Sequence, residues 1–389
     1  MSQNMAHMSI LKDAMEPETK RRRPSESEGN EDRLSDLPEC VLLHILSLMQ
    51  GEEVVRTCVL SARWKHLWKC LPRLVLHSSD FTSVKIFCKF VTKFLAHCDE
   101  SVGLDTLDFQ RRGSVELRLL RRVVSHAIAR NVQHLRIHTT TDIDKLPRDI
   151  LFSIFSCQSL ASLNLSVFHN NILSKGIVFP ESPNLPALTS LHLQNFAFCA
   201  TDNDVAEPFS TLKKLNNLAI DDCTLKDAQI LCISSDSLKS FTIFSKNPRF
   251  YKIELSAPRL SYFAFNGVPR QHISGSSLSS LQQVKVDASI HNISSEQASI
   301  VLNWLRELAN VQSLTVTANT LQILFLIPDL LNIKLSSLVN LKSLKVEMKP
   351  LSYAFAWEAK MNIYKPTVPD GVVEFLLQNS PSAKVSMIK

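Results

Sequence analysis

Residues 33–71 read RLSDLPECVLLHILSLMQGEEVVRTCVLSARWKHLWKCL and place three short helical signals in one stretch. Asp36 is positioned to cap a first helix with Pro38 in its first turn. Apolar residues then recur at helical spacing until Gly51 interrupts them, and two further apolar runs come after it, the second containing Trp68. A stretch this short cannot bury a core of its own. We therefore expect its surplus apolar surface to contact an outside partner.

The same stretch resembles an F-box of the form found in plant proteins. That pattern is a Leu-Pro pair opening a helix, an Ile-Leu pair and then V-R-T-x-V-L-S-x-R-W-x-x-L-W. It is matched at Leu37-Pro38, Ile45-Leu46, Val55-Arg56-Thr57, Val59-Leu60-Ser61, Arg63-Trp64 and Leu67-Trp68. A motif this long is much more specific than a short one. The resemblance implies that the stretch binds a Skp-type adaptor and, through it, a cullin-RING ubiquitin ligase.

We expect the apolar residues of this stretch to divide between two surfaces. The expected adaptor-binding side consists of Leu37, Pro38, Val41, Leu42, Ile45, Leu46, Val55 and Leu60. The expected packing side, which would brace the helices against the next segment of the chain, consists of Trp64, Leu67 and Trp68. The ordinary alternative is a helical subdomain that packs only on its own chain.

Composition excludes several other classes of protein. Of the 389 residues 45% are hydrophobic and 21% charged, which is typical of globular proteins. The formal charge of +6 is modest for this length and does not indicate nucleic-acid binding. No apolar run reaches the ~20 residues of a membrane-spanning helix, so we expect no membrane segment. The nine cysteines include no C-x-x-C pair, which favours reduced thiols in the nucleus and/or cytoplasm.

Residues 1–32 are polar and lack apolar periodicity, which predicts a disordered tail. The tail contains the basic cluster Lys20-Arg21-Arg22-Arg23-Pro24. Such a cluster is either an import signal or a solvated run of charge, and both readings stay open.

From Leu71 onward an internal repeat governs the sequence. The pattern L-x-x-L-x-L, with apolar substitutes, begins at residues 71, 104, 132, 160, 188, 215, 238, 260, 281, 311 and 341. Successive copies are 21 to 33 residues apart, close to the period of leucine-rich repeats. Residues 72–348 are therefore predicted to form an irregular leucine-rich-repeat solenoid, with a parallel sheet of short strands on its concave face. With the three-helix F-box of residues 33–71, the predicted fold class is α/β.

The segments between the repeat motifs should form the outer wall of the solenoid. Residues 116–129 and 295–308 have helical periodicity, whereas the shorter repeats within residues 228–280 have room only for turns or extended chain. Residues 349–389 are predicted to form a C-terminal cap, with a helix at 370–377 and a strand at 384–388. Its resemblance is to a degenerate FBD-like unit of plant F-box proteins with leucine-rich repeats. The aromatic-rich part at 350–369 has no assignment.

No catalytic or metal-binding constellation stands out. His134 and His138 are four residues apart, but on a strand that separation is about 13 Å, too far for two ligands of one metal ion. No nucleophile elbow, H-E-x-x-H pair or Walker loop is present. We therefore expect no metal, no cofactor and no enzymatic activity.

The predicted concave face offers a polar surface in place of a reaction centre. Residues flanking the inward apolar positions point away from the core. The candidate target-binding residues are Arg136, His138, Asn164, His192, Gln194, Thr242, Phe244, Tyr262 and Lys285. Together with the F-box resemblance, they favour the substrate-recognition subunit of an SCF-type ubiquitin ligase, with an unidentified protein target. The alternative is a repeat scaffold or small-molecule sensor that is not coupled to a ligase.

Overall fold

The computed structural model describes residues 36–49, 51–99, 101–140, 148–168, 176–201, 204–246, 251–275, 280–289, 295–349 and 367–388. The predicted N-terminal tail, its basic cluster and most of the unassigned segment 350–369 lie outside these ranges. The chain divides into two compact units, one comprising Met1–Ser162 with Val167–Asn170 and the other Leu163–Ser166 with Asn171–Lys389.

The first unit begins with the short helices expected for residues 33–71. They are α2 (Glu39–Ser47), α3 (Gly51–Arg56) and α4 (Trp64–Leu67), with 3₁₀ turns η1 (Thr57–Val59) and η2 (Trp68–Cys70). The prediction that Asp36 caps the first helix is wrong. Pro38 is the N-cap in extended backbone, and its carbonyl accepts the N–H groups of Val41 and Leu42. A residue two positions earlier cannot take that place.

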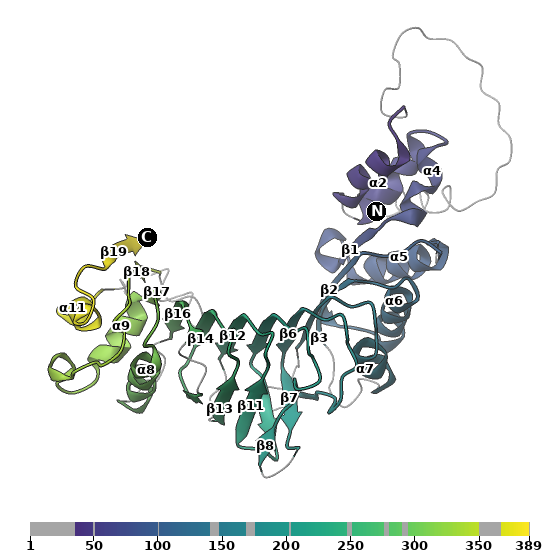
Figure 1. Cartoon of the computed structure of the whole chain (residues 1–389). Coiled ribbons are helices and arrows are strands. Elements are labelled where there is room, and N and C mark those ends of the chain that lie inside the picture. Colours follow the sequence, from purple (N-terminus) through teal and green to yellow (C-terminus); the bar gives the residue numbers. More distant parts are fainter. Residues whose placement is uncertain are drawn as a thin grey trace, which may run out of the picture. The chain divides into compact units, whose positions relative to one another are not determined.

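Strands and helices alternate in the rest of the first unit. The order is β1 (Arg73–His77), η3 (Ser78–Asp80), α5 (Val84–His97), β2 (Thr106–Ser114), α6 (Leu117–Ala129), β3 (His134–Thr140) and α7 (Arg148–Phe155). The strand β4 (Ser162–Phe168) comes next, and its residues are divided between the two units. Strands β1, β2 and β3 pair in parallel, and α5, α6 and α7 cover one side of them (Figure 1). On that side Phe87 of α5 lies 5.8 Å from Phe109 of β2, ring centre to ring centre.

The second unit contains a long run of parallel pairs. The strands are β6 (Ser190–Gln194), β9 (Asn217–Asp221), β12 (Ser240–Ser245), β14 (Tyr262–Gly267), β16 (Gln283–Ala288), β17 (Ser313–Thr317), β18 (Ser343–Glu347) and β19 (Lys384–Ile388). Leu191, Leu218, Phe241, Phe263, Val284, Leu314, Leu344 and Val385 occupy one row across this sheet. The predicted repeat motif therefore sets the register directly.

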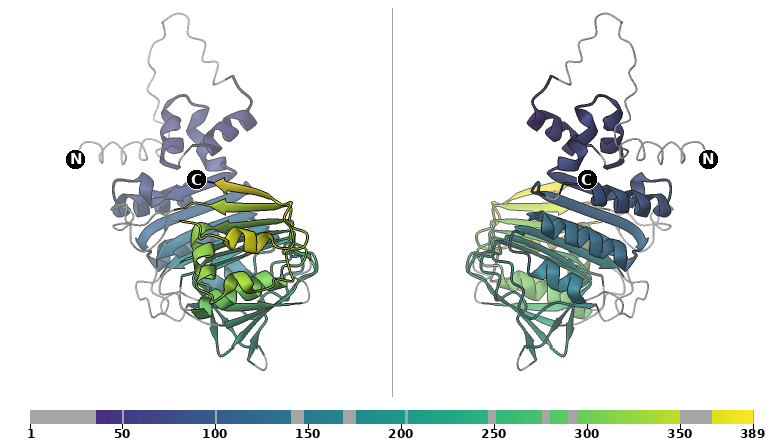
Figure 2. Two further views of the ribbon diagram at one scale, coloured as in Figure 1. Left: turned by 90° about the vertical axis from the view of Figure 1, so that its left-hand side faces the viewer. Right: turned by 90° about the vertical axis from the view of Figure 1, so that its right-hand side faces the viewer.

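The wall behind this sheet changes along the second unit. Short strands form it first: β5 (Ile177–Val178), β7 (Phe196–Cys199) and β10 (Thr224–Lys226) in one sheet, and β8 (Val205–Ala206), β11 (Ile230–Ser234), β13 (Tyr251–Ser256) and β15 (Gln271–Ser274) in another. Helices α8 (Ser295–Glu307) and α9 (Ala318–Phe325) and the turn η6 (Leu330–Asn332) come next, and α11 (Val372–Leu377) precedes β19 (Figure 2). The predictions of extended chain in the short repeats, of helices at 116–129 and 295–308, and of a C-terminal helix and strand are confirmed.

Successive repeats are tied together through the backbone at the start of each strand. The carbonyl oxygen of Asn216 accepts the N–H groups of both Lys239 and Ser240 in the next repeat, at 2.8 and 3.0 Å. The same double acceptance recurs at Pro72, Asp105, Gln133, Thr189, Lys239, Ser261, Gln282 and Gln312. Each of these acceptors is the second residue of a motif. Each repeat therefore supplies the hydrogen-bond acceptor for two backbone N–H groups of the next repeat.

Serine hydroxyls add a side-chain tie at the same place. The serine just before a motif donates to the carbonyl of the first residue of the preceding motif, in the pairs Ser159–Val132, Ser237–Leu215 and Ser280–Leu260 at 2.8, 2.9 and 2.8 Å. The thiol of Cys223 makes a comparable bond of 3.4 Å to the carbonyl of Leu193. Burial raises the pKa of that thiol to about 12, which keeps it a protonated donor.

The α/β fold class predicted from the sequence is confirmed, with a helical N-terminal part followed by parallel strands in repeats. Across the described ranges, no helix combines the length and apolarity needed to cross a bilayer.

Candidate functional site

The F-box helices expose a group of large apolar side chains. Val41, Leu48, Val59 and Leu60 are 38%, 70%, 70% and 62% exposed. Val41 and Leu60 were predicted for the adaptor-binding side. Leu37 and Ile45 are half-buried, and Pro38 is exposed. Four exposed large apolar side chains on so short a helical segment are candidate contacts for a partner protein.

Three residues predicted for the same side lie in the core. Leu42 and Leu46 are fully buried and Val55 is 1% exposed. The assignment of these three to a docking surface is corrected, because a side chain without accessible surface makes no contact with a partner. Helical periodicity identified them as apolar, but it did not show which face the neighbouring helices cover.

The tryptophan side of the F-box helices packs within the first unit. Trp64, Leu67 and Trp68 are buried. The ring of Trp68 lies 5.1 Å from that of Phe94 on α5, and its indole N–H donates to the carbonyl of Lys65 at 3.0 Å. The helix of the first repeat is therefore in direct contact with the end of the F-box stretch.

The strand face opposite the buried motif leucines is called here the open face. In the first unit it consists of Arg73, Val75, His77, Thr106, Asp108, Gln110, His134, Arg136 and His138, which alternate with buried neighbours. In the second unit the residues at the corresponding positions of β6 to β18 form it. Eight of the nine predicted target-binding residues are at least partly accessible, seven of them on the open face and Asn164 on β4.

The exception is Gln194, which is 7% exposed. It is the last residue of β6, beside the turn into β7, and its neighbour Asn195 bonds the carbonyl of Asp221 at 2.9 Å. Gln194 thus has almost no accessible surface for a target to contact. The prediction that it is a target-binding residue is wrong.

Two predicted residues lie close together over strand β9. The imidazole of His192 and the ring of Phe244 are nearly parallel, with centres 6.2 Å apart. Strand β9 runs between their strands and presents the small Ala219 at the level of His192. Asn164 Nδ2 lies 3.4 Å from His192 Nδ1. Thr242 and Tyr262 are half-buried in neighbouring strands.

A carboxyl group stands beside this aromatic pair. Asp221 is aligned with Phe244 across β9 and β12, and its Oδ1 is buried with no hydrogen-bond partner among the described residues. Burial, with the nearby charge of Asp222, raises the pKa of Asp221 to about 6. This carboxyl group therefore takes up a proton more readily than an ordinary aspartate.

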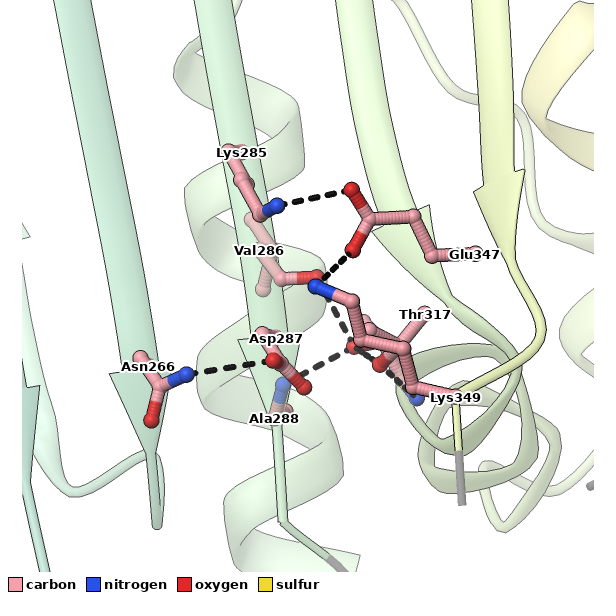
Figure 3. A network of polar contacts seen from close by, with 9 residues as sticks. Asn266, Lys285, Val286, Asp287, Ala288, Thr317, Glu347 and Lys349 are labelled. Atoms are coloured by element: carbon pink, nitrogen blue, oxygen red, sulfur yellow. Dashed lines mark hydrogen bonds and ion pairs between the residues drawn. The ribbon is translucent and has the colours of Figure 1, made fainter. Parts of the chain in front are cut away.

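The C-terminal strands of the open face carry a network of ion pairs (Figure 3). Lys285 and Lys349 bond the two carboxylate oxygens of Glu347 at 2.7 and 2.5 Å. Burial alone would raise the pKa of Glu347, but these two bonds outweigh it and hold that pKa below its usual value. Asn266 donates to Asp287 at 3.1 Å, and burial raises the pKa of Asp287. Charges in this region are thus largely satisfied within the protein.

Among the described residues, no group of His, Cys, Asp and Glu side chains could hold a metal ion. The open face presents hydrogen-bonding groups, charges and a few rings, spaced by neighbouring strands about 4.8 Å apart. Such a surface suits recognition of another molecule.

Comparisons with known proteins agree with both parts of this architecture. The F-box domain model matches residues 34–76, and a model described as "FBD-associated F-box protein At5g56370, LRR repeats" matches residues 120–276. The F-box/LRR-repeat protein At3g26922 of Arabidopsis thaliana is 30% identical over 307 residues, which cover 76% of this chain and 93% of that protein. The chain belongs to the plant F-box/LRR-repeat proteins.

Other members of the family resemble the chain over similar lengths. The Arabidopsis F-box protein At1g60400 is 29% identical across 75% of this chain and 72% of its own length. The F-box/FBD/LRR-repeat protein At1g78750 is 24% identical across 84% of this chain and 73% of its own length. As an F-box/LRR-repeat protein, the chain is suited to a substrate-adaptor role, and the family's F-box implies an interaction with Skp-type adaptors in general.

Sequence reasoning missed several residues of this F-box/LRR-repeat protein that the structure makes prominent. Leu48 and Val59 are exposed at helix ends, where periodicity carries little information. Arg130 is buried at the end of α6 although arginine is ordinarily exposed. The serines that precede the repeat motifs offered a usable signal, since a Ser-Leu pair recurs at the start of several motifs.

Proposed function

We propose that this F-box/LRR-repeat protein is the substrate-recognition subunit of an SCF-type cullin-RING ubiquitin ligase. In this proposal the F-box binds a Skp-type adaptor, and the open face of the repeats binds a target protein. The chain forms or breaks no bond itself. It raises the local concentration of the target at a remote catalytic centre.

One observation carries the proposal: the residues matched by the F-box model expose Val41, Val59 and Leu60. Burying an apolar side chain at an interface contributes about 25 cal/mol per Å² of area removed from water. In the proposal these residues act as anchors that the adaptor buries, since a few buried anchors dominate most protein–protein affinities.

The test is a pull-down of the full chain with a purified Skp-type adaptor. Leu60→Asp places a charge on an exposed position and should not disturb the fold. We expect it to lower adaptor affinity by at least about tenfold. The matched control is Leu326→Asp, also at an exposed leucine, in the second unit.

Equal adaptor binding by the wild-type chain and Leu60→Asp would contradict the proposed surface. Failure of the wild-type chain to bind any Skp-type adaptor would contradict ligase coupling and would favour a scaffold or small-molecule sensor. Thermal unfolding of both variants checks that a loss of binding is not a loss of structure.

We further propose that Trp64, Leu67 and Trp68 brace the F-box against the first repeat. Trp68→Ala should then lower the unfolding temperature of the first unit, because it removes a fully buried ring that contacts Phe94. If Trp68→Ala abolished adaptor binding without any change in thermal unfolding, the tryptophan side would be the adaptor side. For the protein's location we propose the nucleus and/or the cytoplasm, to be checked by imaging a fluorescent fusion.

A further inference from the structure

The open face of the first unit is rich in basic and titratable groups. Its outward positions on β1, β2 and β3 include Arg73, Arg136 and three histidines, His77, His134 and His138. Asp108 is the one carboxylate among those positions. It is 17% exposed and already approached by His77 Nε2 at 3.2 Å and by Arg136 at 3.9 Å. The negative charge of Asp108 is therefore used within the protein.

Arg136 is an accessible cation beside Asp108 on this surface. Its side chain is 51% exposed, and its distance of 3.9 Å to Asp108 is at the outer limit of an ion pair. Arg73 is exposed one row away on β1. Both guanidinium groups have donors to spare for a carboxylate, which arginine binds through paired, charge-assisted hydrogen bonds.

The surroundings of His138 make its pKa sensitive to an added negative charge. Burial, followed by the positive charge of Arg136, lowers the pKa of His138, and Asp108 opposes them only in part. His77 occupies the same row two strands away, with Gln110 between them, and the ring of Phe168 packs 4.8 Å from the His138 ring. An anion at this position would favour the protonated imidazole.

The open face of the second unit differs in this respect. Lys285 and Lys349 are both engaged by Glu347 at 2.7 and 2.5 Å, and Asp287 accepts a bond from Asn266. The charges of Lys285, Lys349 and Glu347 thus largely offset one another, while Lys345 on β18 is exposed. An anionic ligand can therefore form more charge-assisted hydrogen bonds on the open face of the first unit.

We propose that the open face of the first unit binds a carboxylate-rich, extended segment of the target protein, with Arg136 as its main anchor. This inference rests on the proposed function, since it names the chemistry of the target that the repeats would hold. Rows of side chains about 4.8 Å apart on parallel strands present repeated donors to the acidic side chains of an extended segment.

An acidic peptide fits this surface better than a nucleic acid does. The array is small: two arginines and three imidazoles around one carboxylate. Nucleic-acid sites concentrate many permanent cations along a backbone track. Histidine-based charge is suited to a ligand whose binding varies with pH.

The test uses the full chain in complex with its adaptor and a fluorescein-labelled peptide of alternating aspartate and serine. The reference probe replaces each aspartate with asparagine. Fluorescence anisotropy should show binding of the aspartate peptide only, weakening as salt is raised. Arg136→Gln should weaken it by about tenfold, as expected for the loss of a charge-assisted bond.

Lys345→Gln is the matched control. Lys345 is exposed and holds the same position in its motif on β18 as Arg136 does on β3. Its substitution removes the same charge from the chain and should leave peptide binding unchanged. Affinity of the wild-type complex should also rise as pH falls through about 6.5 and below, because binding favours the protonated form of His138, whose pKa burial lowers, and His138→Gln should flatten that dependence.

Three results would overturn the inference: equal binding of the two peptides, equal losses in Arg136→Gln and Lys345→Gln, or tighter binding of a single-stranded oligonucleotide than of the peptide at the same salt concentration. None of them affects the adaptor pull-down, so this inference can fail while the proposed function stands. The proposed function would fail separately, if the wild-type chain did not bind an adaptor.

Discussion

The guanidinium group of Arg130 donates a hydrogen bond of 3.0 Å to the carbonyl oxygen of Leu71, the residue directly after the F-box helices. Its Nε donates a second, of 2.6 Å, to the carbonyl of Val102 in the loop between α5 and β2. Arg130 is 1% exposed, and burial lowers its pKa without removing its charge. One side chain thus connects the F-box, the first repeat and α6.

Replacing Arg130 by methionine should destabilise the first unit. The apolar substitute fills a similar volume but leaves the buried carbonyl of Leu71 and the part-buried carbonyl of Val102 without these donors, which costs about 2–4 kcal/mol. Urea unfolding measures the difference. Arg118→Met, at an exposed position of α6, is the control and should change the free energy of unfolding little. Equal stability of the two variants would mean that the desolvation of Arg130 cancels its bonds.

The stability of the same region should depend on pH because of His126. Burial and the charges of Arg130 and Arg122 lower its pKa from 6.5 to about 4. Between these values the unfolded chain binds a proton that the folded chain does not, so stability should fall as pH drops from 6.5 towards 4. His126→Gln should show a shallower fall than wild type in urea unfolding at a series of pH values. His97→Gln, at an exposed position, should retain the wild-type slope.

Gly267 is required by a close approach between strands. It has φ +129°, and a Cβ there would lie 1.9 Å from the carbonyl oxygen of Ser245 on the paired strand. Gly267→Ala should therefore lower the free energy of unfolding by roughly 2 kcal/mol or more. Gly103→Ala meets nothing within 4 Å and serves as the control. Similar melting temperatures for the two variants would contradict the need for glycine at position 267.

Asp221 should limit stability at neutral and higher pH. Its pKa is raised from 3.8 to about 6, so stability falls as pH rises between these two values, and the full penalty of burying the charged form remains at higher pH. Asp221→Asn removes the charge and should raise the melting temperature at pH 8 but hardly at pH 4. Asp236→Asn, at an exposed carboxylate, controls for the change in net charge. A stabilisation by Asp221→Asn that is independent of pH would exclude this cause.

Much of the fold could be predicted because its signal is local. Each L-x-x-L-x-L motif produced a strand that begins at its third residue, since alternating apolar positions fix both the strand and its buried face. The F-box was found from one long motif. Exposure was harder to predict: Leu42 and Leu60 are both apolar, but only tertiary packing decides that the first is buried and the second exposed.

Partners far apart in the sequence were beyond prediction. Lys285 and Glu347 pair across 62 residues because β16 and β18 flank β17, and no pattern near either residue indicates it. Arg130 likewise reaches Leu71 across 59 residues. Such pairs depend on which repeats are neighbours in space, and that in turn depends on the length of every intervening segment.

The ties between neighbouring repeats start within one residue of the motif: at the carbonyl of its second position, or at the serine before it. Insertions and deletions elsewhere in a repeat leave these bonds in place. Gene copies descended from one ancestor can therefore change the length and secondary structure of the wall behind the strands while inheriting the same spacing on the open face. Divergence in binding preference among such copies would then arise from single substitutions at outward positions, without any rebuilding of the scaffold.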